Sequence, residues 1–281
     1  APTKLSIQEK FVKLYLDYLP FLKLRLRRTI IVENVSALIG LDEISTLEMI
    51  GDNVVDEIAG SLSKFGLTGT YYKDEKFSEN LIGEVKENDA EINFTWNSGA
   101  PVPTIPADKF SVRWEGYICP PSNAEYTFIA EVSEPDEIVK LYIDDQLTAI
   151  QKGTGDSNLS VEASQKLTGG KMYRLKLEYA DINQQSSIRL FWKTDSVPKA
   201  ILPREFLFPD SIVQNFTKDV ETFHKAALFI TGFKLEKDEV AHFKFYRDNW
   251  DKIDFTALQP IHWSRICDYV RLRNAVPGRS S

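Results

Sequence analysis

The sequence of 281 residues predicts an α+β chain in which an antiparallel β-sandwich is inserted between two helical segments that pack together. Three observations predict this fold class. Apolar residues recur with a helical period near both ends of the chain. Between residues 66 and 209, apolar and polar residues alternate in short runs separated by turn residues. The 17 Phe, 11 Tyr and 5 Trp residues suit a pleated sheet. We therefore expect three parts: residues 1–65, 66–209 and 210–281.

The first part reads as a series of helices. Ser6 fits an N-cap, and apolar residues follow it at helical spacing. Pro20 is typical of the first turn of a helix, and Gly40 fits the end of that second helix. Asp42 and Asp52 fit the N-caps of two shorter helices.

The second part reads as strands with one buried and one solvated face. The alternating runs are GLTGTYY, EINFTW, FSVRWEGYI, AEYTFIAEV, IVKLYI, YRLKLEYA and SIRLFWK. Clusters rich in Pro, Gly, Asn and Asp separate these runs. Several short strands at this spacing predict a sandwich or a barrel.

Helical spacing returns after Pro209. One apolar face is expected from Val220, Phe223, Ala227, Leu228 and Ile230, with Gly232 at its end. Residues 236–247 and 261–273 predict two more helices. Neither helical flank is long enough for a stand-alone domain, so we expect the two flanks to pack together around an inserted sandwich.

Charge is distributed unevenly along the chain. Residues 66–209 carry 15 Lys and Arg against 22 Asp and Glu, a net of −7, and the remainder carries 19 of each sign. An acidic surface disfavours nucleic acid as a partner, because phosphate binding needs a basic face. No run of 18 apolar residues occurs, so we expect no direct membrane insertion.

The ends of the chain and its cysteines indicate little about the cellular compartment. The first ten residues show no signal-peptide pattern and lead into a helical region, so we expect an excised or processed piece of a larger protein. A secreted, extracellular parent is what the family resemblances described below imply. Cys119 and Cys267 fit buried free thiols, although a bridge between them stays open at this point.

The sandwich region resembles a known family. The stretches GLTGTYYKDEKF (66–77), FSVRWEGYICPPSNAEYTF (110–128), KLYIDDQL (140–147), GGKMYRLKLEYA (169–180) and IRLFWKTDSVPKAILP (188–203) carry the resemblance. They are similar to the fourteen-kilodalton domain of anthrax protective antigen, which is also found in yeast adhesins and some glycosidases. The resemblance implies a β-sandwich that can bind sugars.

The helical flanks resemble a second family. The stretches LKLRLRRTIIVENVSALIGLD (22–42), HKAALFITGFKLEKDEVAHF (224–243) and WSRICDYVRLRNAVP (263–277) are similar to segments of the A component of bacterial insecticidal toxin complexes. This resemblance implies a place in the outer shell of a secreted virulence factor. Other subunits of the same assembly and a host cell-surface glycan or receptor would then be its partners.

In adhesins of the first family, two adjacent aspartates hold a calcium ion that grips sugar hydroxyls. Alignment on the LYID motif places that metal pair at Asp136 and Glu137, in a loop that also contains Glu134. The family pattern is Asp-Asp-Gly, whereas this chain has the bulky Ile138 after the pair, which weakens the calcium prediction. The more obvious pair, Asp144-Asp145, lies between two strand-like runs and predicts a hairpin turn instead.

A second loop, residues 153–158, completes the predicted binding surface. It contributes Asp156 and Asn158 as further candidates for ligand contact. The sequence shows no phosphate-binding loop, no nucleophile elbow and no zinc spacing among its three histidines. We therefore expect no enzyme activity and no obligatory cofactor, with calcium as the one cofactor to test.

The sequence supports three hypotheses on function. The first is cell-surface recognition of a glycan or protein receptor by the sandwich of a toxin-complex A-type protein, through the loops at one end. The second is a structural spacer of the shell that binds no ligand. The third is an accessory carbohydrate-binding domain of a carbohydrate-active enzyme.

Overall fold

The computed structural model describes residues 6–13, 19–62, 64–89, 91–144, 146–152, 159–182 and 185–276. The chain divides into two compact units. The helical unit consists of residues 1–63 together with 214–281, and the sandwich unit consists of residues 64–213. The predicted fold class, an antiparallel sandwich inserted between helical segments that pack together, is confirmed.

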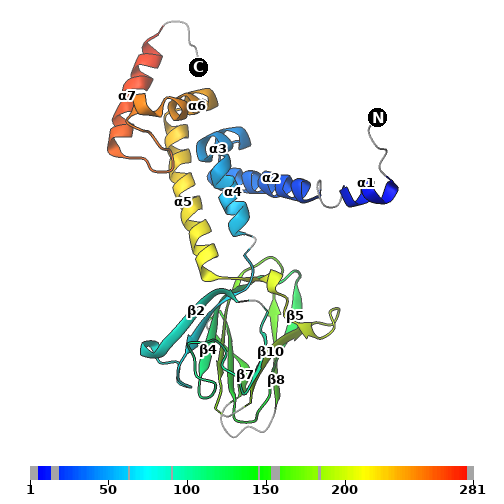
Figure 1. Ribbon diagram of the computed structural model, residues 1–281. Coiled ribbons are helices and arrows are strands. Elements are labelled where there is room, and N and C mark those ends of the chain that lie inside the picture. The colour runs from blue at the N-terminus through cyan, green and yellow to red at the C-terminus, as the bar shows by residue number, and fades with distance from the viewer. Residues whose placement is uncertain are drawn as a thin grey trace. The chain divides into compact units, whose positions relative to one another are not determined.

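The helices of the described chain form before and after the sandwich (Figure 1). They are α1 (Ile7–Lys13), α2 (Leu19–Ile39), α3 (Glu43–Ile50), α4 (Asp52–Ser61), α5 (Asp210–Gly232), α6 (Lys237–Phe245) and α7 (Pro260–Ala275). Val35 of α2 and Val55 of α4 share one core with Ala226 of α5, Val240 of α6 and Ile266 of α7. Burial of these faces holds the two flanks together, because neither flank encloses a core alone.

Of the two N-caps expected at Asp42 and Asp52, the structure confirms the first and corrects the second. Asp42 caps α3 as predicted, since its side chain accepts a hydrogen bond from the Ser45 N–H at 2.9 Å. Asp52 is not a cap but the first residue of α4, and Gly51 (φ 84°) is the N-cap. A carboxylate in the first turn still interacts favourably with the helix dipole.

The strands form two sheets that face each other (Figure 1). The strands are β1 (Leu67–Tyr72), β2 (Ile82–Asp89), β3 (Asn93–Asn97), β4 (Ser111–Ile118), β5 (Ala124–Val132), β6 (Ile138–Ile143), β7 (Gln146–Lys152), β8 (Ser160–Leu167), β9 (Tyr173–Ala180), β10 (Ser186–Lys193), β11 (Ala200–Ile201) and β12 (Leu207–Phe208). One sheet has the order β2-β1-β4-β9-β6-β7 with β12 beside β4. The other has the order β11-β10-β5-β8 with β3 beside β10. Trp114, Leu177 and Leu190 are among the fully buried side chains of the core between the sheets.

Two edge strands, β2 and β8, are not among the seven predicted runs. In β2, both Ile82 and Val85 are exposed, so no buried face marks the strand in the sequence. In β8, only Leu167 is buried. Edge strands commonly carry such polar patterns, which oppose pairing with other chains.

The chain enters and leaves the sandwich at adjacent points. The Gly66 N–H donates to the Leu207 carbonyl oxygen at 2.9 Å. The rings of Phe65 and Phe208 pack edge to face, with centroids 5.7 Å apart. This closure of the sandwich is what an insertion into another unit requires.

The structure bears on the two cysteines and on the expectation that the chain does not insert into a membrane. Cys119 and Cys267 are both free thiols. Within the described residues, none of the helices combines the length and the hydropathy that a membrane span needs.

The contact between Arg273 of α7 and Glu239 of α6 should contribute more to the stability of the helical unit than its exposed ion pairs do. The Arg273 Nη1 lies 2.9 Å from the Glu239 Oε2, and both side chains are nearly buried. Arg273 also donates to the Phe233 and Lys234 carbonyl oxygens. We expect Arg273→Met to lower the free energy of unfolding by about 2–4 kcal/mol, because Glu239 loses its counter-charge in a buried position. Urea unfolding followed by helical circular dichroism measures this loss.

Arg271 provides a matched control on the same helix. Its partner Asp268 is 3.6 Å away, and the Arg271 side chain is 81% exposed. Arg271→Met should change stability by less than about 0.5 kcal/mol. Equal losses in the two variants would contradict a special role for Arg273.

Candidate functional site

Strand register gathers several loops at one end of the sandwich. Ala180 of β9 pairs with both Ser111 of β4 and Ile138 of β6, so the loops that adjoin these residues leave the sheet together. The Val132 N–H donates to the Leu159 carbonyl oxygen at 2.9 Å, which places the end of β5 beside the segment that leads into β8. We name this region the loop end. It comprises the β3–β4, β5–β6 and β9–β10 connections, as far as they are described.

A buried carboxylate, Glu137, organises the loop end. Its Oε1 accepts hydrogen bonds from the Tyr179 hydroxyl and from the Ser187 N–H, the latter at 3.2 Å. Its Oε2 accepts from the Glu134 N–H at 2.8 Å. The Ser133 hydroxyl lies 3.3 and 3.4 Å from the two oxygens. Glu137 therefore ties the β5–β6 loop to β9 and to β10.

The electrostatics of Glu137 follow from its burial. The side chain is fully buried, and this burial raises the pKa of Glu137 against the opposing effect of its hydrogen bonds. Burial and the adjacent Glu137 carboxylate also raise the pKa of Tyr179. The Tyr179 hydroxyl consequently stays protonated and serves as a donor.

A second buried carboxylate, Asp181, follows β9. Its Oδ2 accepts from the Lys109 N–H at 3.0 Å, and its own N–H donates to the Phe110 carbonyl oxygen at 2.9 Å. Its Oδ1 is buried and has no hydrogen-bond partner in the part of the chain that the structure describes. Burial raises the pKa of Asp181 to about 7. The Lys109 N–H opposes this shift, and the charges of Glu137 and Asp108 add to it.

An aromatic cluster adjoins these polar residues through the Tyr179 ring. The Trp96 ring packs edge to face on Phe110 with centroids 5.4 Å apart, and it lies 5.8 Å from the Tyr179 ring. Trp96 itself is only partly buried. The loop end thus combines acidic acceptors with a partly accessible indole.

The predicted calcium site at Asp136 and Glu137 does not fit the residues present. Calcium takes six to eight oxygen ligands. Both Glu137 oxygens accept hydrogen bonds from protein donors, and the side chain faces inward. Among the described residues, no three acidic, histidine or cysteine side chains converge in a way that could hold a metal ion. Glu137 is a loop anchor rather than an exposed ligand contact, which corrects its predicted role.

The other predicted residues fall in three places. Glu134 and Asp136 are part-exposed on the loop that Glu137 anchors. Asp144 follows β6, which pairs with β7 as the predicted hairpin requires. It has φ 50°, and its Oδ1 accepts a hydrogen bond from the Arg174 N–H at 2.9 Å. Asp156 and Asn158 lie outside the described residues.

The sequence did not single out Asp181 or Tyr179 as site residues. Tyr179 fits the alternation of a strand, and Asp181 fits a polar residue that ends it. Their partners are distant in sequence: Lys109 is 72 positions from Asp181, and Glu137 is 42 positions from Tyr179. Spacing along one sequence carries no signal for such pairs.

Comparison with family models identifies the sandwich. A model described as the PA14 domain matches residues 63–205, about half of the chain. The chain belongs to the PA14 family. The match contains β1 to β11 and the whole loop end, so the resemblance expected for the sandwich is confirmed.

Relatives of the PA14 sandwich are parts of longer proteins. The chain is 33% identical over 144 residues to the anti-sigma-I factor RsgI3 of Acetivibrio thermocellus, which covers 51% of this chain and 21% of that protein. The chain therefore spans about a fifth of the length of this curated relative. Among solved structures, an anti-sigma factor domain-containing protein from Clostridium clariflavum is 32% identical, with 52% of this chain and 47% of that chain covered and a TM-score of 0.47.

A glycan-bound protein is also among the similar structures. It is the Epithelial Adhesin 6 A domain from Candida glabrata, solved in complex with Galb1-3GlcNAc. It is 17% identical, with 52% of this chain and 87% of that chain covered and a TM-score of 0.42.

The assignment to an insecticidal toxin complex is wrong. The relative of the PA14 sandwich found among curated proteins is an anti-sigma-I factor, so a toxin-shell recognition role and virulence are not supported. The stretches that suggested the toxin family form α2, parts of α5 and α6, and α7. Apolar residues at helical spacing are common to packed helices in general and do not specify a family.

We expect Glu137→Gln to destabilise the PA14 sandwich. The Gln amide would point its NH₂ group at donors on one side or the other, because both oxygens of Glu137 accept hydrogen bonds. The loss should be about 2–4 kcal/mol in urea unfolding followed by tryptophan fluorescence. Glu125→Gln, on the exposed side of β5, should be neutral. A neutral Glu137→Gln would show that the anchor is dispensable.

Asp181 should make stability depend on pH. Its pKa rises from an ordinary 3.8 to about 7 in the folded protein, so the folded state binds the proton more tightly than the unfolded state. Its contribution to stability is fully present below pH 4 and is lost as the pH rises through 7. Asp181→Asn should therefore match the wild type at pH 4 and exceed it at pH 8 by roughly 2–4 kcal/mol. Unfolding curves of both proteins between pH 4 and pH 8 measure the difference in stability. Equal stability of the wild type and the variant at pH 8 would refute the predicted pH dependence.

Proposed function

We propose that the PA14 sandwich is a non-catalytic, extracellular carbohydrate-recognition module that binds neutral sugars at the loop end without calcium. The observation that carries this proposal is the Glu137 anchor. It fixes the β5–β6 loop to two strands through protein hydrogen bonds. A loop held in one conformation loses little entropy when a ligand binds.

The chemistry of the loop end suits sugar hydroxyls. Glu134 and Asp136 are part-exposed carboxylates, and a carboxylate forms strong hydrogen bonds with hydroxyl donors. Trp96 is a partly accessible indole nearby, and sugar rings present an apolar face to such a surface. Pockets that combine a few polar groups with aromatic surface are typical of small-ligand sites.

The net charge of the module favours uncharged ligands. All of the excess negative charge, −7, lies in residues 66–209. Uronate or sulfated glycans would be repelled at this surface at physiological ionic strength. The glycan in the similar adhesin structure, Galb1-3GlcNAc, is neutral and is a sensible first probe.

A glycan array with the full 281-residue chain tests the proposal. We expect binding to neutral glycans that is unchanged by EDTA and weaker for uronate-containing glycans. Combined Glu134→Ala and Asp136→Ala substitution should reduce this binding by about tenfold or more, because truncation removes both part-exposed carboxylate acceptors of the loop. Glu125→Ala, on an exposed part of β5, should bind as the wild type does.

Three outcomes would refute parts of the proposal. Loss of binding in EDTA would restore the calcium hypothesis. Equal loss in the Glu125→Ala control would place binding elsewhere on the module. No binding to any glycan would contradict the proposal as a whole.

A further inference from the structure

The β3–β4 connection of the loop end is fastened at both of its ends. At its start, the Ser186 hydroxyl donates to the Asn97 carbonyl oxygen at 3.2 Å. At its finish, the Lys109 N–H donates to the Asp181 Oδ2 at 3.0 Å, and the Asp181 N–H donates to the Phe110 carbonyl oxygen at 2.9 Å. Asp181 follows β9 and Ser186 begins β10. The two ends of the β9–β10 connection therefore hold the β3–β4 connection in place.

The two fastened residues have backbone angles that side chains rarely adopt. Asn97 has φ 54° and Lys109 has φ 58°, both in the left-handed region. A residue other than glycine stays in this region only where the surrounding contacts hold it there. The hydrogen bond to Asp181 supplies this constraint at Lys109. Its strength therefore decides whether this end of the connection keeps its conformation.

Asp181 is an incomplete anchor, because only one of its two carboxyl oxygens is satisfied. The side chain is fully buried, and its Oδ1 has no hydrogen-bond partner among the residues that the structure describes. A neutral carboxyl group tolerates this position, whereas a carboxylate leaves a charged oxygen without a donor. The charges that act on Asp181 are those of Glu137 and Asp108, and both are negative. Lys109 contributes its N–H to the carboxyl group, and the protonated Tyr179 hydroxyl adds no charge.

The Asp181 anchor reaches the indole that we propose as a surface for sugar rings. Phe110, whose carbonyl oxygen accepts from Asp181, is fully buried. Its ring packs edge to face on Trp96 with centroids 5.4 Å apart, and it lies 6.1 Å from the Tyr179 ring. A displacement of the contact between Asp181 and Phe110 therefore displaces the surface on which Trp96 rests.

We propose that protonated Asp181 holds the β3–β4 connection and Trp96 in the arrangement that binds glycans, and that the loss of this proton weakens binding. Asp181 is thus a positioning residue that acts through Lys109 and Phe110 and does not itself touch the sugar. This inference rests on the proposed glycan binding at the loop end. Burial raises the pKa of Asp181 to about 7, so the form that holds the connection is present below this pH and is lost as the pH rises through it.

Isothermal titration calorimetry of the full chain with the neutral probe Galb1-3GlcNAc tests the effect on binding. We expect the affinity to be lower at pH 8 than at pH 5 by about fivefold or more, because proton and glycan binding are coupled. Asp181→Asn should keep the higher affinity at both pH values. Its amide stays neutral, and the amide oxygen can accept from the Lys109 N–H.

Tryptophan fluorescence of the ligand-free chain tests the positioning role separately. We expect a transition centred at about pH 7 in the wild type and none in Asp181→Asn. Trp96→Phe should also remove the transition, because Trp96 is the tryptophan that reports it. Asp108→Asn should move the transition to lower pH, because it removes a negative charge that favours the proton on Asp181. A purely structural role of Asp181 would not produce this shift.

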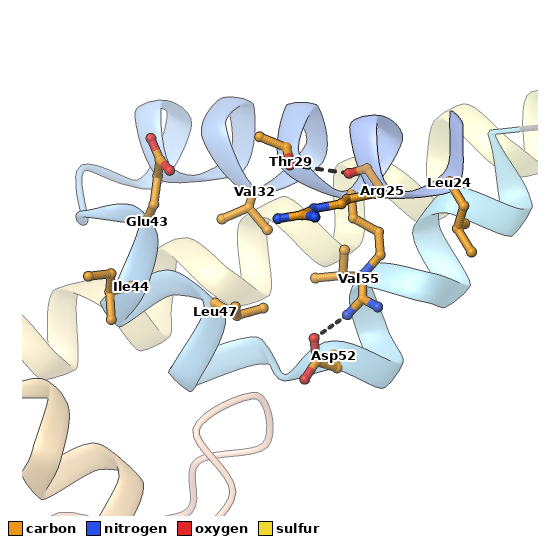
Figure 2. A pocket seen from close by; sticks show the side chains of 10 residues that line it. Leu24, Arg25, Thr29, Val32, Glu43, Ile44, Leu47, Asp52 and Val55 are labelled. Carbon is orange, nitrogen blue, oxygen red and sulfur yellow. Dashed lines mark hydrogen bonds and ion pairs between the residues drawn. The ribbon is translucent and has the colours of Figure 1, made fainter. Parts of the chain in front are cut away.

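Glu43→Gln is the matched control for the removal of a carboxylate. Glu43 belongs to the helical unit, where it lines a groove between α2, α3 and α4 (Figure 2). Both the fluorescence transition and the pH dependence of binding should be those of the wild type. Circular dichroism verifies that each variant folds.

The outcomes separate this inference from the proposed function. The absence of the fluorescence transition in the wild type, or its persistence in Asp181→Asn, would overturn the positioning role. Equal glycan affinity of the wild type at pH 5 and pH 8 would overturn the coupling to binding. A fluorescence transition without glycan binding at either pH would refute glycan recognition and its pH dependence, while it would support Asp181 as the residue that holds the connection.

Discussion

The loop end of the PA14 sandwich depends on how one buried carboxylate is satisfied. A charged group removed from water is tolerated only when hydrogen bonds replace its solvation. Glu137 receives these bonds from its own loop, from Tyr179 on β9 and from Ser187 on β10. Because the donors come from both sheets, the same contact that solvates the carboxylate also sets the position of the β5–β6 loop. Glu137 is thereby unsuited to hold a cation, since both of its carboxylate oxygens accept hydrogen bonds from protein donors.

Much of the fold could be predicted from the sequence, for a physical reason. A strand that buries one face must alternate apolar and polar residues along its sequence. The seven alternating runs correspond to β1, β3, β4, β5, β6, β9 and β10. The edge strands β2 and β8 escaped prediction because an edge strand need not bury a face, as the exposed Val85 shows. The helical spacing of apolar residues likewise predicted the helices. The same stretches could not identify a family, and the toxin-complex assignment made from them is contradicted by the relative of the sandwich.

The site was less predictable than the fold. The sequence located the right loop, but it offered Glu137 as an exposed ligand, whereas the side chain is fully buried. Whether a carboxylate faces water or the protein depends on donors that are distant in sequence, such as Ser187, 50 positions away. Asp181 went unrecognised for the same reason, since nothing next to it in the sequence signals the Lys109 N–H or its buried second oxygen.

The closure of the sandwich at its base has an evolutionary consequence. Gly66 and Leu207 are joined by a backbone hydrogen bond, so removal of everything between them would leave two chain ends close enough to be religated by a short peptide. The helical core draws on residues before and after this point, such as Val35 and Ala226, and its described members include none from the sandwich. A gene can therefore acquire, lose or exchange the sandwich as a cassette, while the host helices keep their packing. Homologues of the helical unit that lack any β-domain would be the natural record of such exchange.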